Sequence, residues 1–160
     1  MSSETLWDVV NLLNQYIDGW HDAYAFVFLG LKQVGRGEGY HIVENYEFKG
    51  IINKAFVNNI PIGFDSCSAH KFLEMYKDDE RIEQFKLLAE PCESTCFSIY
   101  IDVDGYIWPC SFLQHGKGIL SALNMKNVED FMKQVWYYQW FVSFRKHLIN
   151  GGRKCPSFKV

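Results

Sequence analysis

The chain has 160 residues, 48% of them hydrophobic and 22% charged, which is the composition of a soluble globular protein with a real core. A formal net charge of -3, without any block of Lys and Arg, argues against nucleic acid as the main partner. The sequence has no run approaching the ~18 apolar residues that cross a membrane, so we expect a cytoplasmic protein with no membrane partner.

The first part of the chain shows a helix, strand, helix, strand pattern. Apolar residues repeat at helical spacing over 6–17 and 48–56, which predicts two helices. The continuously apolar run 23–29 predicts a strand covered on both sides in a parallel sheet, and 60–64 predicts a second short strand. This order is typical of a βαβ unit, which we place in residues 1–66.

The second part, residues 67–160, is predicted to contain a hairpin between helices. Residues 97–101 are strand formers, and Asp104-Gly105 supplies the turn to a return strand. A further helix is expected from Asn127, and a last helix follows it. The predicted class is therefore α/β, and we expect the two parts to form one compact unit.

Four of the five cysteines are spaced as in a metal site. Cys92 and Cys96 are separated by three residues, Cys110 directly follows the hairpin, and Cys67 lies upstream. Thiolates that a hairpin brings together can bind one metal ion or an iron-sulfur cluster. An odd number of cysteines in a reducing compartment favours ligation over disulfides. The alternative is that these are small apolar core residues.

The three cysteines around the hairpin leave a fourth ligand position open. Cys67 is favoured, because it stands at a predicted strand end, where loops carry functional groups. Cys155 or an exogenous ligand is the alternative, and His115 is a weaker candidate. Zinc accepts four thiolates as readily as a 4Fe-4S cluster does, so spacing alone does not separate the two cofactors.

The cysteine region resembles the SPASM/Twitch extension of radical SAM proteins. The resemblance rests on Cys92 and Cys96, on the hairpin glycine Gly105, on the phrase Ile-Trp-Pro-Cys-Ser at 107–111, and on the later helix with Trp136. In that family the extension binds auxiliary iron-sulfur clusters beside a partial barrel. The resemblance therefore implies a 4Fe-4S cluster at the cysteines, with zinc as the alternative.

Upstream, the segments 29–37 and 63–67 resemble late strands of the radical SAM partial barrel. The resemblance implies a partial barrel-like βαβ unit over 1–66 and a SPASM/Twitch-like region over 67–160. The SAM-binding cluster of the family needs a C-x-x-x-C-x-x-C motif. Cys92 and Cys96 have its first spacing, but isoleucine stands at position 99 in place of the third cysteine, so the motif is absent. SAM is therefore not expected for this chain alone, and one auxiliary site is the most that it can support.

Arg36 stands in a glycine-rich segment, with glycines at 35, 37 and 39. Such a loop after a strand can bind phosphate, but neither G-K-[ST] nor a full G-x-G-x-x-G follows, and a plain turn is the alternative. The resemblance would put this loop near SAM or substrate, where Arg36 could contact an anionic group.

Two functions follow from these patterns. In the first, the chain is a non-catalytic metal- or cluster-binding protein that acts through a protein partner, for instance as a phage-type inhibitor. In the second, it is the auxiliary-cluster and substrate-binding part of a radical SAM enzyme, and it needs a separate SAM-cluster half. Aromatic residues crowded near 136–144 cannot all face inward on one helix, and open strand edges need covering, so we expect a protein partner or a homo-oligomer.

Overall fold

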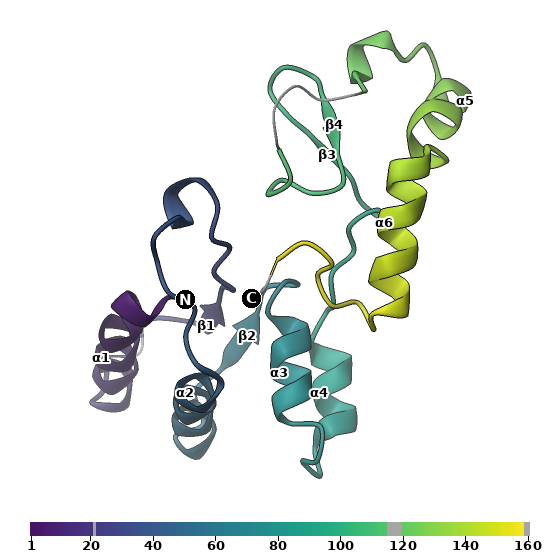
Figure 1. Ribbon diagram of the computed structural model, residues 1–160. Helices are drawn as coiled ribbons and strands as arrows, with labels where there is room; N and C mark the ends of the chain where they lie inside the picture. Colours follow the sequence, from purple (N-terminus) through teal and green to yellow (C-terminus); the bar gives the residue numbers. More distant parts are fainter. Residues whose placement is uncertain (21, 115–119, 159–160) are drawn as a thin grey trace. The chain divides into compact units, whose positions relative to one another are not determined.

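The computed structural model describes residues 1–20, 22–114 and 120–158 (Figure 1). The chain divides into two compact units, Met1–Pro91 with Phe158 and Cys92–Ser157. The sequence instead predicted one compact unit with an internal boundary after residue 66. That boundary falls inside the first unit, because the helices that follow it contribute aromatic side chains to the first core.

The first unit is mixed α/β, with a two-stranded parallel sheet. Its elements are the 3-10 helix η1 (Ser3–Thr5), α1 (Leu6–Ile17), β1 (Phe26–Phe28), the 3-10 helix η2 (Gly35–Gly37), α2 (Asn45–Val57), β2 (Ile62–Phe64), α3 (Ala69–Met75) and α4 (Ile82–Leu88). β1 and β2 pair in parallel, with Phe26 opposite Ile62 and Phe28 opposite Phe64. The predicted βαβ connection through α2 is thus confirmed.

One face of this sheet carries the core. Phe26 packs edge-on against Tyr16 of α1 at 5.5 Å between ring centroids, and Phe28 packs against Phe48 of α2 at 6.0 Å. Val27 points the other way and is 59% exposed. The prediction that this strand is covered on both sides was wrong, because both helices gather on the Phe26 and Phe28 side of a strand only three residues long.

The helices α3 and α4 complete the first core with stacked aromatic rings. Phe64 of β2 stacks on Phe72 of α3 at 4.2 Å between centroids, and Phe72 contacts Phe85 of α4 at 5.1 Å. Phe85 in turn stacks on Phe56 of α2 at 5.5 Å. These contacts explain why residues after 66 belong to the first unit.

The second unit joins an antiparallel hairpin to helices. Its elements are β3 (Tyr100–Ile101), β4 (Ile107–Trp108), the 3-10 helix η3 (Ala122–Asn124), α5 (Val128–Phe131), the π-helical turn η4 (Met132–Trp136) and α6 (Gln139–Asn150). The predicted hairpin is confirmed, with Tyr100 opposite Trp108. The helix predicted from Asn127 is confirmed too, and the side chain of Asn127 caps it by accepting a hydrogen bond from the amide of Asp130 at 2.9 Å.

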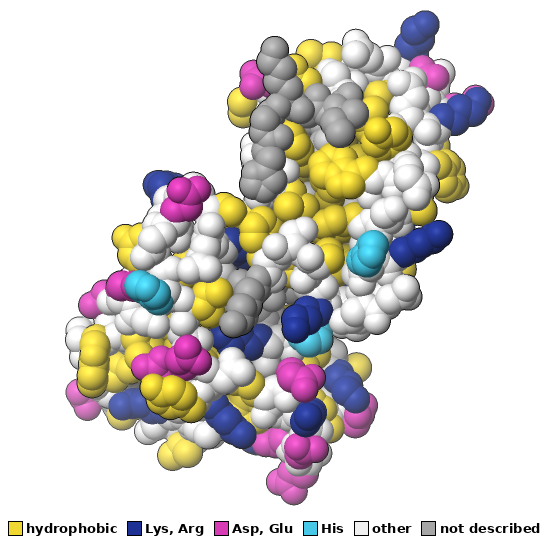
Figure 2. Space-filling model, viewed as in Figure 1, with side chains coloured by type: hydrophobic (Ala, Val, Ile, Leu, Met, Phe, Trp, Pro, Cys, Tyr) yellow, Lys and Arg dark blue, Asp and Glu magenta, His cyan; other side chains and the backbone are white. Residues whose placement is uncertain are grey.

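The core of the second unit centres on Ile107, Val135 and Phe141, around which partly buried side chains such as Trp140 pack. Trp108, Phe144 and Leu148 are buried as well. Figure 2 shows hydrophobic side chains on the visible face of this unit, and Tyr137 is 64% exposed. In the part of the chain that the structure describes, every helix is too short or too polar to cross a bilayer.

Candidate metal centre

The segment that carries Cys92 and Cys96 is a compact loop. The amide of Cys96 donates to the carbonyl of Glu93 at 2.9 Å, and the amide of Thr95 donates to the carbonyl of Ser98 at 2.7 Å. These bonds turn the chain back on itself within a few residues. The two thiols are consequently presented by one tight loop.

A side-chain hydrogen bond fastens this loop to the end of the hairpin. The hydroxyl of Ser94 donates to the carbonyl of Pro109 at 2.5 Å. Pro109 immediately precedes Cys110, so the third cysteine follows directly from the point of attachment. The hairpin is itself braced by the indole of Trp108, which donates to Asp102 at 2.7 Å.

A third attachment brings the segment of Cys155 to the same loop. The guanidinium of Arg153 donates to the carbonyl of Cys92 at 2.6 Å and lies 5.7 Å from the ring centroid of Phe97. Gly152 and Arg153 both adopt positive φ, +65° and +68°, which turns the chain sharply after α6. Three segments of the second unit, which together carry four cysteines, are thereby joined by hydrogen bonds.

The thiols influence one another electrostatically. Burial raises the pKa of the Cys92 thiol, and the neighbouring thiols of Cys155 and Cys96 raise it further, while a backbone hydrogen bond from Ser94 and the charge of Arg153 oppose the rise. Cys155 and Cys96 are therefore close enough to Cys92 to act on its charge. Soft thiolate donors of this kind suit zinc or an iron-sulfur cluster.

The structure separates the predicted ligands into two groups. Cys92, Cys96 and Cys110 belong to the second unit together with Cys155, whereas Cys67 belongs to the first unit, in the half-buried loop after β2. Cys155 thus shares a unit with the three cysteines around the hairpin, and Cys67 as the fourth ligand stays a prediction. Among the described residues, no three His, Cys, Asp or Glu side chains are already set at metal-binding distances. His115 lies outside the described residues.

Thr95 and Arg145 were missed by the sequence analysis. Thr95 is 0% exposed, has φ +58°, and its hydroxyl has no hydrogen-bond partner within the described part of the chain. The guanidinium of Arg145 on α6 donates to the carbonyl of Thr95 at 2.5 Å and to that of Trp136 at 3.1 Å. No sequence pattern marks Thr95, but the paired glycines before Arg153 do signal a turn that returns the chain after α6.

The glycine-rich loop of the first unit has a packing role. A Cβ added at Gly37 would lie 2.2 Å from the carbonyl oxygen of Lys32, so this position requires glycine. Arg36 is exposed on the short helix η2. These facts favour the plain turn, and the anion-binding role of Arg36 stays a prediction.

The carboxyl ends of β1 and β2 carry a second polar cluster. Asp65 accepts from buried Lys32 at 2.6 Å, from the amide of Gly30 at 3.1 Å and from the amide of Ser68 at 2.9 Å. Burial opposes ionisation of Asp65, but the hydrogen bonds outweigh it and hold the pKa of this carboxyl below its usual value. The carboxylate is fully engaged in joining the loops that follow the two strands.

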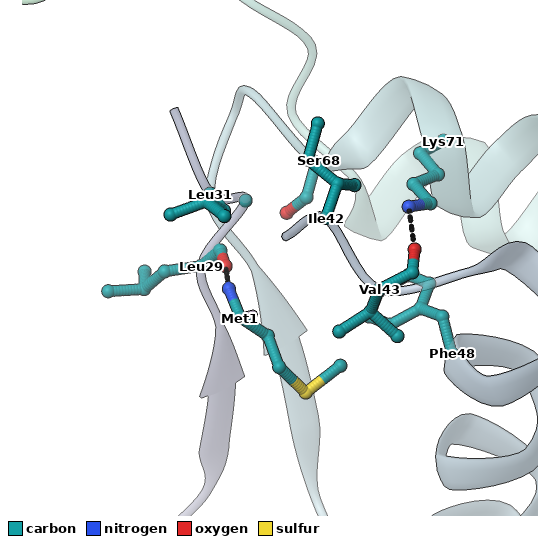
Figure 3. Close-up of a pocket in the computed structure, with 9 residues that line it drawn as sticks. Met1, Leu29, Leu31, Ile42, Val43, Phe48, Ser68 and Lys71 are labelled. Carbon is teal, nitrogen blue, oxygen red and sulfur yellow. Dashed lines mark hydrogen bonds between the residues drawn. The ribbon is translucent and has the colours of Figure 1, made fainter. Parts of the chain in front are cut away.

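Beside this cluster lies a small open hollow (Figure 3). Its walls are mainly apolar, and its cation Lys71 is engaged: the ammonium group donates to the carbonyl of Val43 at 3.0 Å and lies 5.4 Å from the ring centroid of Phe48. Figure 3 also shows the amino group of Met1 donating to the carbonyl of Leu29. The polar groups here stabilise the fold, so the hollow is a weaker candidate than the cysteine loop.

No protein-family model, curated protein or solved structure matches this chain. The resemblance to radical SAM proteins accordingly remains a prediction from the sequence. The metal centre likewise remains a prediction.

Proposed function

We propose that the second unit binds a metal ion or a 4Fe-4S cluster through Cys92, Cys96, Cys110 and Cys155, and that the protein acts through a protein partner without catalysing a reaction itself. Cys155 is chosen as the fourth ligand because it lies in the same unit as the other three, with Cys67 as the alternative. The resemblance to SPASM/Twitch extensions makes the cluster the first choice of cofactor, with zinc second.

One observation carries this proposal. Hydrogen bonds from Ser94 to Pro109 and from Arg153 to Cys92 fasten three separate chain segments together, and each segment contributes cysteine. A hydrophobic core of the same size would not need polar clamps at these particular points. The clamps are what a thiolate site requires to assemble ligands from distant parts of the sequence.

The two candidate cofactors, a 4Fe-4S cluster and zinc, would supply different chemistry at the proposed cysteine ligands. A 4Fe-4S cluster carries one electron at a time, whereas zinc would act as a structural link between the same thiolates. In either case the chain contributes the thiolates, their burial and the surrounding hydrogen bonds. A partner-binding role needs only the folded unit that the metal stabilises.

A partner role is supported by apolar residues left on the surface. Val27 and Leu29, on and directly after β1, are 59% and 60% exposed, and Phe97 beside the cysteine loop is 75% exposed. Exposed apolar groups near a strand edge are typical of interaction surfaces. The partner is a protein, whether another species, such as the target of a phage-type inhibitor, or a second copy of this chain.

The second candidate function is the auxiliary-cluster and substrate-binding part of a radical SAM enzyme. The parallel pairing of β1 and β2 through α2 favours it, because a partial barrel is built from such units. Isoleucine at position 99 removes the third cysteine of a SAM-cluster motif. This candidate therefore requires a separate protein that supplies the SAM cluster.

The proposal is tested by counting iron, sulfide and zinc in protein purified without oxygen. Near-stoichiometric iron and sulfide with a broad absorbance near ~400 nm identify a cluster, and one zinc without colour identifies a structural site. Cys67→Ser and Cys155→Ser are the matched pair. Loss of metal in Cys155→Ser with retention in Cys67→Ser supports the proposed ligand set, the opposite result restores Cys67, and a metal-free wild type refutes the site.

A further inference from the structure

The charges of the chain are unevenly distributed along the sequence. All 19 Asp and Glu residues stand at or before position 130. From position 131 onward the chain has no carboxylate side chain, and its Lys and Arg residues are Lys133, Arg145, Lys146, Arg153, Lys154 and Lys159. Protein surfaces normally mix both signs of charge, so a segment with one sign alone marks a region suited to a ligand of the opposite sign.

The ion pairs of the described residues leave much of this positive charge unmatched. Lys133 pairs with Glu129 at 2.7 Å, but no ion pair within the described part of the chain includes Arg145, Lys146 or Lys154. Lys146 and Lys154 are also exposed. A carboxylate from another molecule would therefore reach cations that have no carboxylate of their own among the described residues.

Two arginines bring positive charge to the cysteine loop. The guanidinium of Arg145 donates to the carbonyl of Thr95 at 2.5 Å, and that of Arg153 donates to the carbonyl of Cys92 at 2.6 Å. These acceptors are neutral, so they position the guanidinium groups without cancelling their charge. Cations from α6 and from the turn after it are consequently held at one loop.

An exposed aromatic ring lies beside one of these cations. The guanidinium of Arg153 is 5.7 Å from the ring centroid of Phe97, and the side chain of Phe97 is 75% exposed. Arginine and aromatic residues are enriched at protein interfaces, where they often contribute most of the binding energy. Phe97 is thus an apolar contact point next to the cations.

We propose that Arg145, Lys146, Arg153, Lys154 and Phe97 form a docking surface for an acidic segment of a partner protein. Carboxylates of that segment pair with the guanidinium and ammonium groups, and an apolar side chain next to them packs on Phe97. The inference rests on the partner role proposed above and needs no metal. It adds the chemistry by which the partner is recognised.

Two other roles for these cations are less well supported. Cations near the carboxyl end of α6 stabilise the helix dipole, which accounts for Lys146 but not for an exposed Phe97 beside Arg153. Nucleic acid would also pair with the cations, but the formal net charge of the chain is -3, which opposes a long polyphosphate backbone. A short acidic peptide segment fits a small cluster of cations better.

The first test measures binding of the full chain to a fluorescein-labelled peptide of glutamates interrupted by phenylalanine, using fluorescence anisotropy. We expect the double variant Lys146→Glu with Lys154→Glu to bind this peptide at least about 10-fold more weakly than wild type. Lys77→Glu with Lys86→Glu is the matched control, because it makes the same change in net charge on exposed lysines of the first unit. This control should bind as wild type does.

The second test uses Phe97→Ala, which truncates a largely exposed ring and should leave the fold intact. We expect about 10-fold weaker binding of the peptide that contains phenylalanine. A peptide of equal length made of glutamate alone should bind wild type and Phe97→Ala equally. The same loss with both peptides would overturn Phe97 as the apolar contact point.

Three results would overturn the docking surface. In the first, Lys146→Glu with Lys154→Glu binds the peptide as tightly as wild type, whether or not its melting temperature falls. In the second, a single-stranded thymidine oligonucleotide binds more tightly than the peptide and loses affinity in the same variant. In the third, wild type self-associates at low salt and the variant does not, which assigns the surface to a second copy of the chain. Metal content enters none of these measurements, so a metal-free protein would refute the proposed metal centre alone.

Discussion

The two units differ in how they are stabilised. The first has a continuous core with stacked rings from α2, α3, α4 and β2, and it buries Leu13, Phe48, Ile52 and Phe72 almost completely. The second has a smaller buried cluster of Ile107, Val135 and Phe141, and it also buries Trp108, Phe144 and Leu148. Small units with little core commonly depend on a metal or on disulfides. We therefore expect the second unit to depend more on its proposed cysteine site than the first unit does.

The largest difference in stability between the two units should therefore appear when metal is removed. A structural thiolate site contributes roughly 10–16 kcal/mol, so a strong chelator should unfold the second unit and leave the first folded. Tryptophan fluorescence reports on this, because Trp108 is buried and Trp140 is half-buried in the second unit, whereas Trp7 in the first is largely exposed already. We expect a red shift on chelation; an unchanged spectrum would contradict the comparison.

Breaking the Lys32–Asp65 ion pair should weaken the first unit alone. Lys32 is buried, and Asp65→Asn would remove the carboxylate of its ion pair, at a cost of about 3–5 kcal/mol. Urea unfolding followed by hydrogen exchange at α2 would measure the loss. The double variant Lys32→Met with Asp65→Leu is the control, because it removes both charges and should recover most of the stability. Faster exchange in the second unit would count against independent units.

Acid should act on the first unit through the same carboxylate. The folded pKa of Asp65 is lower than its unfolded value, so its contribution to stability is fully present above the unfolded pKa of about 3.9 and is lost as the pH falls through the folded pKa. We expect wild type to lose stability below about pH 4. In Asp65→Asn this part of the pH dependence should be absent, and an identical acid profile in both proteins would exclude Asp65 as its source.

Two glycine substitutions should shift the units in opposite directions. Gly105 has φ +81°, and a Cβ there would lie 2.9 Å from Leu123, so Gly105→Ala should cost the second unit more than about 1 kcal/mol. Gly50 lies in α2 with nothing within 4 Å of an added Cβ, so Gly50→Ala should stabilise the first unit by about 0.5–1 kcal/mol. Thermal melts resolved by unit would measure both changes.

Local patterns were sufficient to predict several of the main helices and strands of this fold. The apolar spacing in α2 and the turn at Gly105 depend on neighbouring residues, and both were predicted from them. The exposure of Val27 and the membership of Phe72 in the first core depend on which elements pack together. Periodicity contains no such information, so the strand was predicted to be covered on both sides and the boundary was placed too early.

In the candidate site, too, some features follow from neighbouring residues in the sequence and others from contacts between distant residues. The spacing of Cys92, Cys96 and Cys110 predicted a thiolate cluster, because all three lie around one hairpin. The choice between Cys67 and Cys155 depends on Arg153, whose contact with Cys92 links distant positions of the chain. The left-handed conformation of Thr95 is likewise set by contacts with α6 and leaves no mark on the sequence.

The clamp between Arg153 and Cys92 has a consequence for biosynthesis. The two residues are 61 positions apart, so at typical rates of synthesis roughly 3–12 s separate their addition to the growing chain. During that interval the first unit has been made in full up to Pro91, while the early cysteines of the second lack the segment that closes over them. If the proposed four-thiolate site forms, we expect it to take up metal only after Cys155 has been added to the chain.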